Sequence, residues 1–350
     1  MVQIVHDVLL LIFTELQDYP ATLYSCALVN SSWCSVAVNI LWKFVLNDLS
    51  DYKQETREKI YNVIAHFLPD GPEDPLPINN ILLPSIKFPR RPTFEYIEYF
   101  NRISQCWIRD MCLVDVLIDD DYEDDEYENN GSDEEENQFT LLNEALELNN
   151  ENYDETCEDI DWYKWEKCLG KASFPHLEYL ETSFLPNNIE SLILEKSGGN
   201  VLEIDIRYPL EFQDYQTENK QIIRAICNHC PKLRRLTLDI DPRNLDEFNG
   251  ILSNCTQLEK LYLATKKFII PNGDELLKIM VNGSPATLRE FLFDDNWNFS
   301  LEGLESFLIS WKCKDRFPIK FKHYFDKMLI SWTDNHENIL EKYKRNGTII

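Results

Sequence analysis

The hexapeptide LRRLTL at residues 233–238 places three leucines in the frame Leu-x-x-Leu-x-Leu, and this frame decides the fold of the C-terminal half. The frame recurs in four other places. In chain order these are the partial copy Leu177-Leu180, the β-branched copy Val201-Ile204-Ile206, Leu258-Leu261-Leu263, and the copy with aromatic residues Leu288-Phe291-Phe293. The frames start 24, 32, 25 and 30 residues apart. Such a recurrence predicts a chain of repeated structural units, each of which begins with a short buried strand.

A helical pattern lies between each frame and the next. The helices are predicted over residues 187–196, 217–229, 244–253, 273–281 and 300–311. A strand and a helix repeated at a regular spacing predict a stack in which each unit buries its apolar face on its neighbours. Residues 334–347 predict a terminal capping helix, because acidic residues come early and basic residues late, as the helix dipole favours.

These repeats resemble leucine-rich repeats, although irregular ones. The asparagine expected three residues after the last leucine of the frame occurs only as Asn296, whereas Pro209, Asp241 and Lys266 occupy that position elsewhere. The resemblance therefore implies a short curved α/β array rather than a regular horseshoe.

Alternate residues of the predicted strands should lie together on one exposed, concave face, while the frame residues point inward. This face mixes both charges with one aromatic and one aliphatic residue, which suits protein recognition. An ordinary solvated face remains the alternative. The candidate substrate-binding residues are Arg207, Arg235, Thr237, Asp239, Lys260, Tyr262, Glu290, Leu292 and Asp294, flanked by Glu203 and Asp205.

The first 46 residues predict three short apolar helices. Pro20 suits the first turn of the second helix, and Ser31 or Ser32 is the N-cap candidate of the third. Helices this short do not close a sizeable core by themselves, so a partner or the rest of the chain should cover them. An ordinary amphipathic bundle is the plainest alternative.

This segment resembles the F-box. The features that match its spacing are Asp7, Ile12-Phe13, Leu16, Leu28-Val29, Trp33 and Leu41-Trp42. The run from Cys26 to Cys34 is similar to F-box proteins that some fungal lineages carry in large families, while Ile4-Val5 stand where the family has Leu-Pro. The resemblance implies docking to a Skp-family adaptor, and through it a cullin, by Ile4, Val5, Val8, Ile12, Phe13, Leu16, Leu28, Trp33, Leu41 and Trp42.

The expected fold class is therefore α+β with several domains. Residues 1–46 form the F-box-like domain, residues 47–118 a helical and proline-rich linker region, and residues 162–350 the repeat domain with its capping helix. In the linker region, helices are predicted over residues 55–68 and 94–117, with prolines between them over residues 69–92.

Residues 119–161 form an acidic insert with 20 acidic residues and no lysine or arginine, which predicts disorder in its first half. Ser132, followed by three acidic residues, suits an acidophilic kinase, and a passive solvated loop is the alternative. Removing these 20 charges from the net charge of −27 leaves −7, so the remainder is only mildly acidic.

Charge and composition argue against two classes of partner. The net charge of −27 argues against nucleic-acid binding, and no apolar run is long enough to span a bilayer, so neither nucleic acid nor membrane is an expected partner. Ten cysteines without a secretory signal predict reduced thiols and a cytoplasmic or nuclear location.

No residue pattern indicates catalysis. Neither a P-loop nor a dinucleotide fingerprint is present, and we expect no cofactor. Cys227, His229 and Cys230 supply half of a zinc site without a second half, so no metal site is expected either. The resemblance to the F-box implies a non-catalytic substrate-recognition subunit of a Skp–cullin–F-box ubiquitin ligase acting on an unidentified protein. The alternatives are an adaptor-binding scaffold with a degenerate F-box and a plain repeat-type interaction module.

Overall fold

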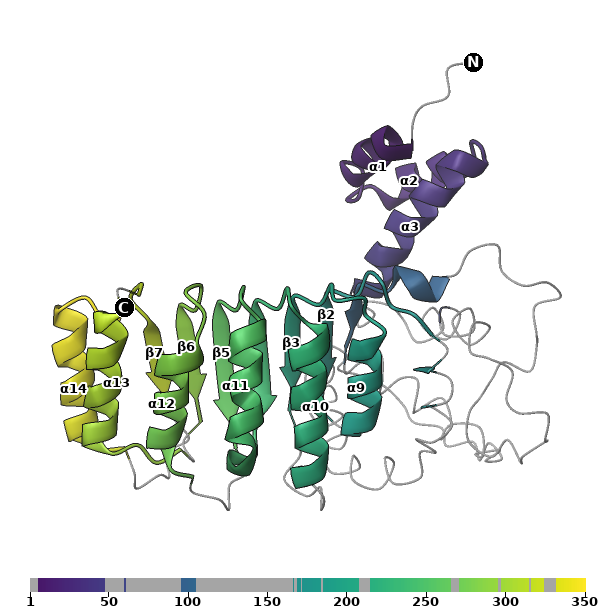
Figure 1. Cartoon of the computed structure of the whole chain (residues 1–350). Helices are drawn as coiled ribbons and strands as arrows, with labels where there is room; N and C mark the ends of the chain where they lie inside the picture. The colour runs from purple at the N-terminus through teal and green to yellow at the C-terminus, as the bar shows by residue number, and fades with distance from the viewer. Residues whose placement is uncertain are drawn as a thin grey trace, which may run out of the picture.

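The chain forms a three-helix N-terminal module and a longer array of strands and helices (Figure 1). The computed structural model describes residues 6–47, 60, 96–104, 166, 169–170, 172–183, 185–207, 215–265, 271–294, 297–314, 316–323 and 332–350. The predicted helix at 55–68 (apart from Ile60), the segment 69–92 and the acidic insert 119–161 lie outside these residues.

The array is built on a parallel sheet whose strands pair in the order of the sequence, β1 to β7. The strands are β1 (Arg102–Ile103), β2 (Tyr179–Thr182), β3 (Glu203–Ile206), β4 (Arg235–Asp239), β5 (Lys260–Ala264), β6 (Glu290–Phe293) and β7 (Lys320–His323). The helices are α9 (Asn187–Glu195), α10 (Tyr215–His229), α11 (Leu245–Asn254), α12 (Gly273–Gly283), α13 (Leu301–Cys313) and α14 (Asp334–Arg345). The structure is thus α+β, and the predicted strand–helix units and capping helix are present.

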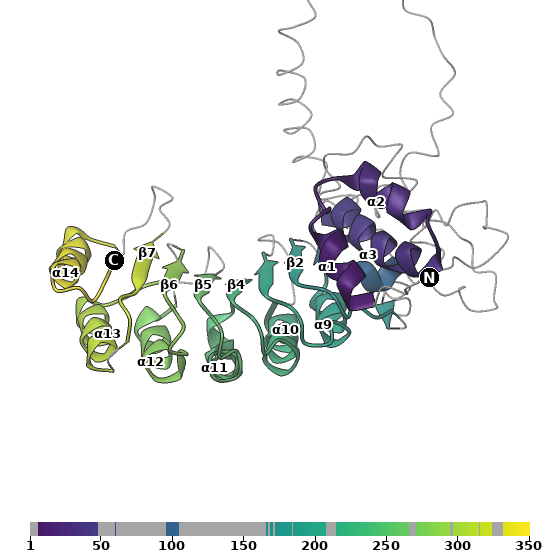
Figure 2. The ribbon, with the colours of Figure 1, turned by 90° about the horizontal axis from the view of Figure 1, so that it is seen from above.

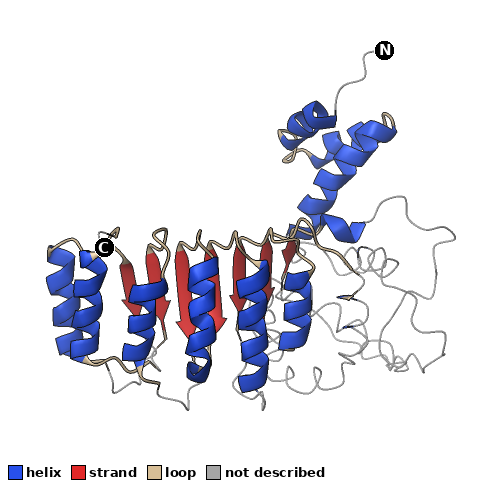
Figure 3. Ribbon diagram, viewed as in Figure 1, coloured by secondary structure: helices blue, strands red, loops and turns tan. Residues whose placement is uncertain are grey.

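The helices lie on one side of the sheet, and the array bends gently so that the strand side is concave (Figures 2 and 3). The frame residues fill the layer between strands and helices. Leu236, Leu261 and Phe291 are in register on β4, β5 and β6, and all three are buried. The same frame therefore explains both the pairing register and the core.

Two strands were not predicted from the sequence. β1 falls inside the helix expected over 94–117, and that expectation is wrong here: a 3-10 helix at Tyr96–Tyr99 precedes β1, which pairs with β2. Phe100 and Ile103 are buried in the core of the array, so the sheet begins within the predicted linker region. At the other end, β7 adds a further unit in which Phe321 continues the row of core aromatics.

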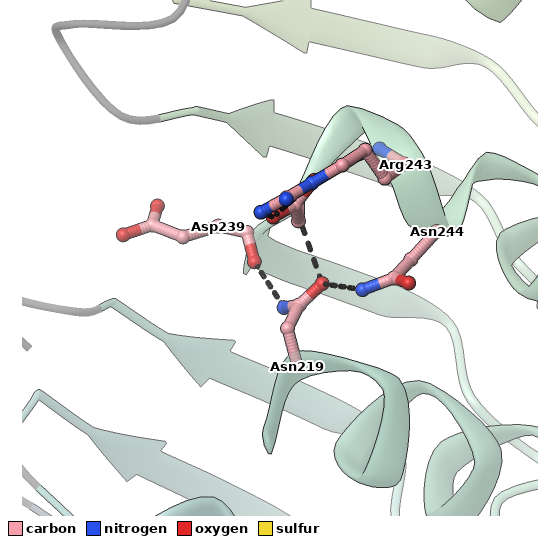
Figure 4. A network of polar contacts seen from close by, with 5 residues as sticks. Asn219, Asp239, Arg243 and Asn244 are labelled. Carbon is pink, nitrogen blue, oxygen red and sulfur yellow. Dashed lines mark hydrogen bonds and ion pairs between the residues drawn. The ribbon is translucent and has the colours of Figure 1, made fainter. Parts of the chain in front are cut away.

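A buried polar network joins the units at β4, where the expected asparagine is replaced by Asp241 (Figure 4). Asn219 of α10 is 0% exposed and donates to the Asp239 carbonyl at 2.8 Å. Its side-chain oxygen accepts the Asp241 backbone N–H at 3.1 Å, and the Asp241 carboxylate accepts from Arg243. The helix thus supplies the amide that the loop lacks, which satisfies backbone groups removed from water.

The last residues close the β7 end of the array. Ile349 forms a parallel bridge with Ile319 and is buried, as is Tyr343 of α14. His336 near the start of α14 contacts the Phe299 carbonyl through Nε2 at 2.9 Å, and its ring stacks on Trp332. The capping helix therefore covers apolar surface that a further repeat would otherwise cover.

Candidate functional site

The N-terminal module packs three helices, α1 (His6–Thr14), α2 (Pro20–Ala27) and α3 (Ser31–Asn47), around a small core of its own. α2 begins at Pro20 as predicted, but Asn30 rather than Ser31 or Ser32 caps α3, because its side-chain oxygen accepts the Trp33 N–H at 3.0 Å. The core residues are Leu9, Phe13, Leu23, Val36, Ala37 and Ile40. Phe13 also meets the Trp33 ring edge to face at 5.3 Å.

Most of the large apolar side chains on α1 and around α2 point away from this core. Leu11 and Leu28 are each 71% exposed, and six further large apolar side chains of this module are exposed as well. We call this set the apolar face: Val8, Leu10, Leu11, Ile12, Tyr19, Tyr24, Leu28 and Val29. An exposed group of this kind on a small module marks a surface that binds a partner.

The structure describes eight of the ten residues of the predicted adaptor site, and these are exposed, half-buried or, for Phe13 alone, fully buried. Val8, Ile12 and Leu28 lie on the apolar face. Leu16, Trp33 and Leu41 are half-buried against the small core, and Trp42 packs against the core of the array. Ile4 and Val5 lie outside the described residues.

Phe13 requires a correction. It was assigned to the adaptor-binding surface, but it is only 1% exposed and belongs to the core of the module. Leu9, Phe13 and Leu16 follow one another at helical spacing and form the stripe that faces α3. Phe13 therefore supports the apolar face from beneath.

Sequence reasoning missed Leu10, Leu11, Tyr19, Tyr24 and Val29 as surface residues. For Leu10 and Leu11 the signal was present, because Val8 to Phe13 are six consecutive apolar residues. A helix can bury one stripe in a small core, so a run that covers all sides of the helix leaves part of it outside.

The comparisons with known proteins bear on this module. Residues 6–48 match the family model described as F-box-like. The N-terminal module is an F-box-like domain. F-box domains generally bind Skp-family adaptors, and the proteins that carry them are typically non-catalytic receptors. A search of curated proteins finds no match to the chain.

The F-box-like domain is joined to the start of the array. α3 contacts the 3-10 helix at Tyr96–Tyr99, which directly precedes β1, and Trp42 near the end of α3 packs on the core of the array. Figure 1 shows the domain at the β1–β2 end, away from the capping helix. Among the described residues, no helix is long and apolar enough to cross a membrane.

The second candidate surface is the strand side of the array, where side chains lie in two rows set by the strand register. The first row holds Arg102, Tyr179, Glu203, Arg235, Lys260, Glu290 and Lys320. The second row holds Glu181, Asp205, Thr237, Tyr262, Leu292 and Lys322. None of these thirteen residues is buried, and all the candidate substrate-binding residues lie in or directly after these rows.

Ion pairs join neighbouring members of the rows. Arg235 reaches Glu203 at 3.0 Å and Arg207 reaches Asp205 at 2.8 Å. The hydrogen bond to Asp205 raises the pKa of Arg207, whose guanidinium also lies 6.0 Å from the centre of the Tyr262 ring. Burial and the nearby Glu181 carboxylate raise the pKa of Tyr179 to about 12, so this phenol stays protonated at neutral pH.

Two of the candidate carboxylates differ in their surroundings. Asp294 accepts the Thr265 backbone N–H at 2.9 Å, so one of its oxygens serves the fold by tying β6 to the end of β5. Asp239, the last residue of β4, contributes its backbone carbonyl to the Asn219 network. Within the part of the chain that is described, no three His, Cys, Asp or Glu residues are placed to hold a metal ion.

The cysteines at the ends of α10 and α11 occupy repeat positions, as expected from their spacing before the frames. Cys230 and Cys255 are buried where each helix turns into the next strand, and the Cys255 thiol donates to the Cys230 carbonyl at 3.3 Å. Burial raises the pKa of Cys255 to about 12 and also raises that of Cys230. Such thiols are poor nucleophiles.

Proposed function

We propose that this chain is a substrate-recognition subunit of a Skp–cullin–F-box ubiquitin ligase. The F-box-like domain would dock a Skp-family adaptor, which links it to a cullin, and the array would hold a target protein. The single observation that carries the proposal is the apolar face, which is exposed on the one module that matches the F-box-like model.

The division of apolar residues supports docking through α1 and α2. Leu9 and Phe13 already belong to the small core, whereas Leu11, Ile12 and Leu28 leave about half or more of their side-chain surface exposed in the isolated domain. Burying three such side chains in an interface is worth roughly 1.5–3 kcal/mol each in transfer free energy. A second protein that covers them gains that free energy.

The array supports the other half of the proposal. Its strand side presents ordered rows of side chains at the spacing of adjacent strands, and its irregular repeats resemble leucine-rich repeats. The mechanism would be proximity: a target held by the array gains effective concentration near a ubiquitin-charged enzyme bound to the same complex. The chain itself would make and break no bonds.

The test of adaptor docking is co-purification with a Skp-family adaptor. The decisive variant is the pair Leu11→Asp and Leu28→Asp, since both side chains are exposed and their change spares the core. We expect wild type to retain the adaptor and this variant to lose at least tenfold in affinity. Phe13→Glu is unsuitable because it would break the core of the domain.

Ile309→Asp is the matched control. Ile309 is also an exposed aliphatic residue, but it lies on α13 of the array. Adaptor binding should survive this change. If wild type fails to retain the adaptor, or if both variants bind equally well, the adaptor-docking proposal is overturned.

A ubiquitination assay on proteins that co-purify with the chain separates a ligase subunit from an adaptor-binding scaffold. Transfer of ubiquitin that depends on Leu11 and Leu28 supports the ligase. Adaptor binding without any modified partner supports the scaffold.

A further inference from the structure

The β5–β7 end of the strand side differs from the rest in charge and in exposed aromatic surface. Over β1–β4, the basic residues Arg102, Arg207 and Arg235 are outnumbered by four carboxylates. Over β5–β7 the basic residues outnumber the carboxylates. There, Lys260, Lys320 and Lys322 face Glu290 and Asp294, while Arg289 and Glu259 at the edge of the sheet offset each other.

Glu290 lies between two lysines and does not neutralise both. Its carboxylate is 3.5 Å from the Lys260 ammonium and also contacts the Lys320 ammonium, and its side chain is only 12% exposed. Burial alone would raise the pKa of Glu290, but Lys320 and Lys260 hold it below its usual value, so it is ionised at neutral pH. One positive charge remains in excess over this trio, the exposed Lys322 adds another, and Asp294 offsets one of the two.

Exposed or half-buried apolar side chains lie on the same strands and in the turn before β7. Phe317 is 61% exposed, and the Arg289 guanidinium covers one side of its ring at 3.8 Å from the centre. Tyr262 and Leu292 are half-buried neighbours in the second row, one strand apart. We call Lys260, Tyr262, Arg289, Glu290, Leu292, Phe317, Lys320 and Lys322 the basic–apolar patch.

We propose that the basic–apolar patch binds an extended acidic peptide of a partner protein, in which aspartate or glutamate residues flank an apolar side chain. The acidic groups would pair with Lys260, Lys320 and Lys322, and the apolar side chain would rest on Tyr262, Leu292 or Phe317. This inference rests on the proposed function, since it names the chemical class of the target that the array would hold.

Separate carboxylates suit the patch better than one phosphate group. The backbones of Lys260 on β5 and Lys320 on β7 are two strands apart, about 10 Å across the sheet. The Glu290 carboxylate already lies between their two ammonium groups, which leaves no room there for a single phosphate group. A phosphate dianion is usually held by convergent arginines or backbone N–H groups. Arg289 is committed to the Phe317 ring and to the carbonyls of Ala286 and Leu288.

The same geometry disfavours nucleic acid. A phosphate backbone gains affinity by neutralising charge along its whole length, and here an ionised Glu290 occupies the middle of the lysines. An acidic peptide can instead place its apolar residue over the second row and its charges at the lysines on either side.

The test measures fluorescence anisotropy of labelled eight-residue peptides with the full chain. One peptide carries six Asp or Glu residues around a central Leu-Phe pair, and its matched control replaces each acid by Asn or Gln. We expect the acidic peptide to bind at least tenfold more tightly in 50 mM salt and to lose most of that advantage in 500 mM salt.

The decisive variant is Lys320→Glu with Lys322→Glu, which should weaken binding at least tenfold. Lys278→Glu with Lys312→Glu changes the net charge equally but lies on the exposed helix side, and it should leave affinity within twofold of wild type. Lys322→Gln, a single change at an exposed position, should weaken binding severalfold and keeps the test valid if the double variant fails to fold.

Four outcomes overturn the inference: no preference for the acidic peptide, an equal loss in both double variants, no loss with Lys322→Gln, or tighter binding of a single-stranded oligonucleotide. A fifth is binding that appears only after the acids of residues 119–136 are neutralised, which would make the chain's own acidic segment the occupant.

Adaptor retention is measured on the same samples. Peptide binding without adaptor retention overturns the proposed function alone, and adaptor retention without peptide binding overturns this inference alone.

Discussion

The two parts of the molecule use their apolar residues in opposite ways. In the array, the frame residues and the helix faces pack on each other, and Leu236, Leu261 and Phe291 are essentially inaccessible to solvent. In the F-box-like domain, α1 carries six consecutive apolar residues, of which only Leu9 and Phe13 are buried. A part that satisfies its apolar surface internally stands alone, whereas a part that leaves such surface exposed is built to be covered.

The largest expected effect lies in the array core. Phe293→Ala should destabilise the array by about 3–5 kcal/mol, because a fully buried ring is replaced by a cavity. Phe293 packs against Phe299, Phe321 and Trp332 at ring-centre distances of 4.7, 5.0 and 5.7 Å. Urea unfolding followed by circular dichroism measures the loss. A change below 1 kcal/mol would contradict the description of this end of the array as tightly packed.

The difference between buried and exposed residues of α1 is tested by comparing Phe13→Ala with Leu11→Ala. Phe13→Ala should cost the F-box-like domain about 3–4 kcal/mol, and Leu11→Ala should change its stability by no more than about 0.5 kcal/mol. Hydrogen exchange of peptides covering residues 6–47 reports each effect locally. Equal effects of the two changes would mean that the division between core and apolar face is wrong.

A polar change in the array comes next in size. Asn219→Ala leaves the Asp239 carbonyl and the Asp241 N–H without their buried partner, which should cost about 1–3 kcal/mol. Asn188→Ala is the control, because Asn188 is an amide on α9 whose side-chain hydrogen bond to Glu166 is exposed to solvent. The midpoint of thermal unfolding should be clearly lower for Asn219→Ala than for Asn188→Ala. Similar midpoints would contradict a stabilising role for the Asn219 network.

The smallest effect concerns the charged rows. The folded-state pKa of Glu290 is lower than its ordinary value of 4.5, so its contribution to stability is complete above that value and disappears as pH falls through the folded pKa. Wild type should therefore exceed Glu290→Gln by up to about 1 kcal/mol at pH 6, with the gap closing below pH 4. Urea titrations at several pH values measure the gap. A gap that widens in acid would contradict the ion pairs with Lys260 and Lys320.

The repeated frame was enough to predict the central strands and all five helices between them, because the same residues set strand register and core. β7 was missed because Pro318 and His323 stand where the unit before it has the frame residues Leu288 and Phe293, and β1 because two residues carry no readable period. On α1, the unbroken apolar run left the phase of the helix undecided, which is why Phe13 was placed on the surface. The role of Asn219 was hidden because the amide comes from a helix and not from the loop after the strand.

One backbone feature gives the array a property independent of its side chains. At the edge where helices turn into strands, the Arg234 N–H donates to the Leu202 carbonyl, the Glu259 N–H to the Arg234 carbonyl, and the Arg289 N–H to the Glu259 carbonyl. The same step precedes this series, where Leu202 donates to Glu178, whereas at β7 the Ile319 N–H donates to the Thr348 carbonyl. Successive units therefore start their strands at one level, although the units differ in length. Equivalent residues on neighbouring strands therefore lie about 4.8 Å apart along the array. Residues inserted at the opposite edge of the sheet would lengthen a unit without shifting the positions at which its strands begin.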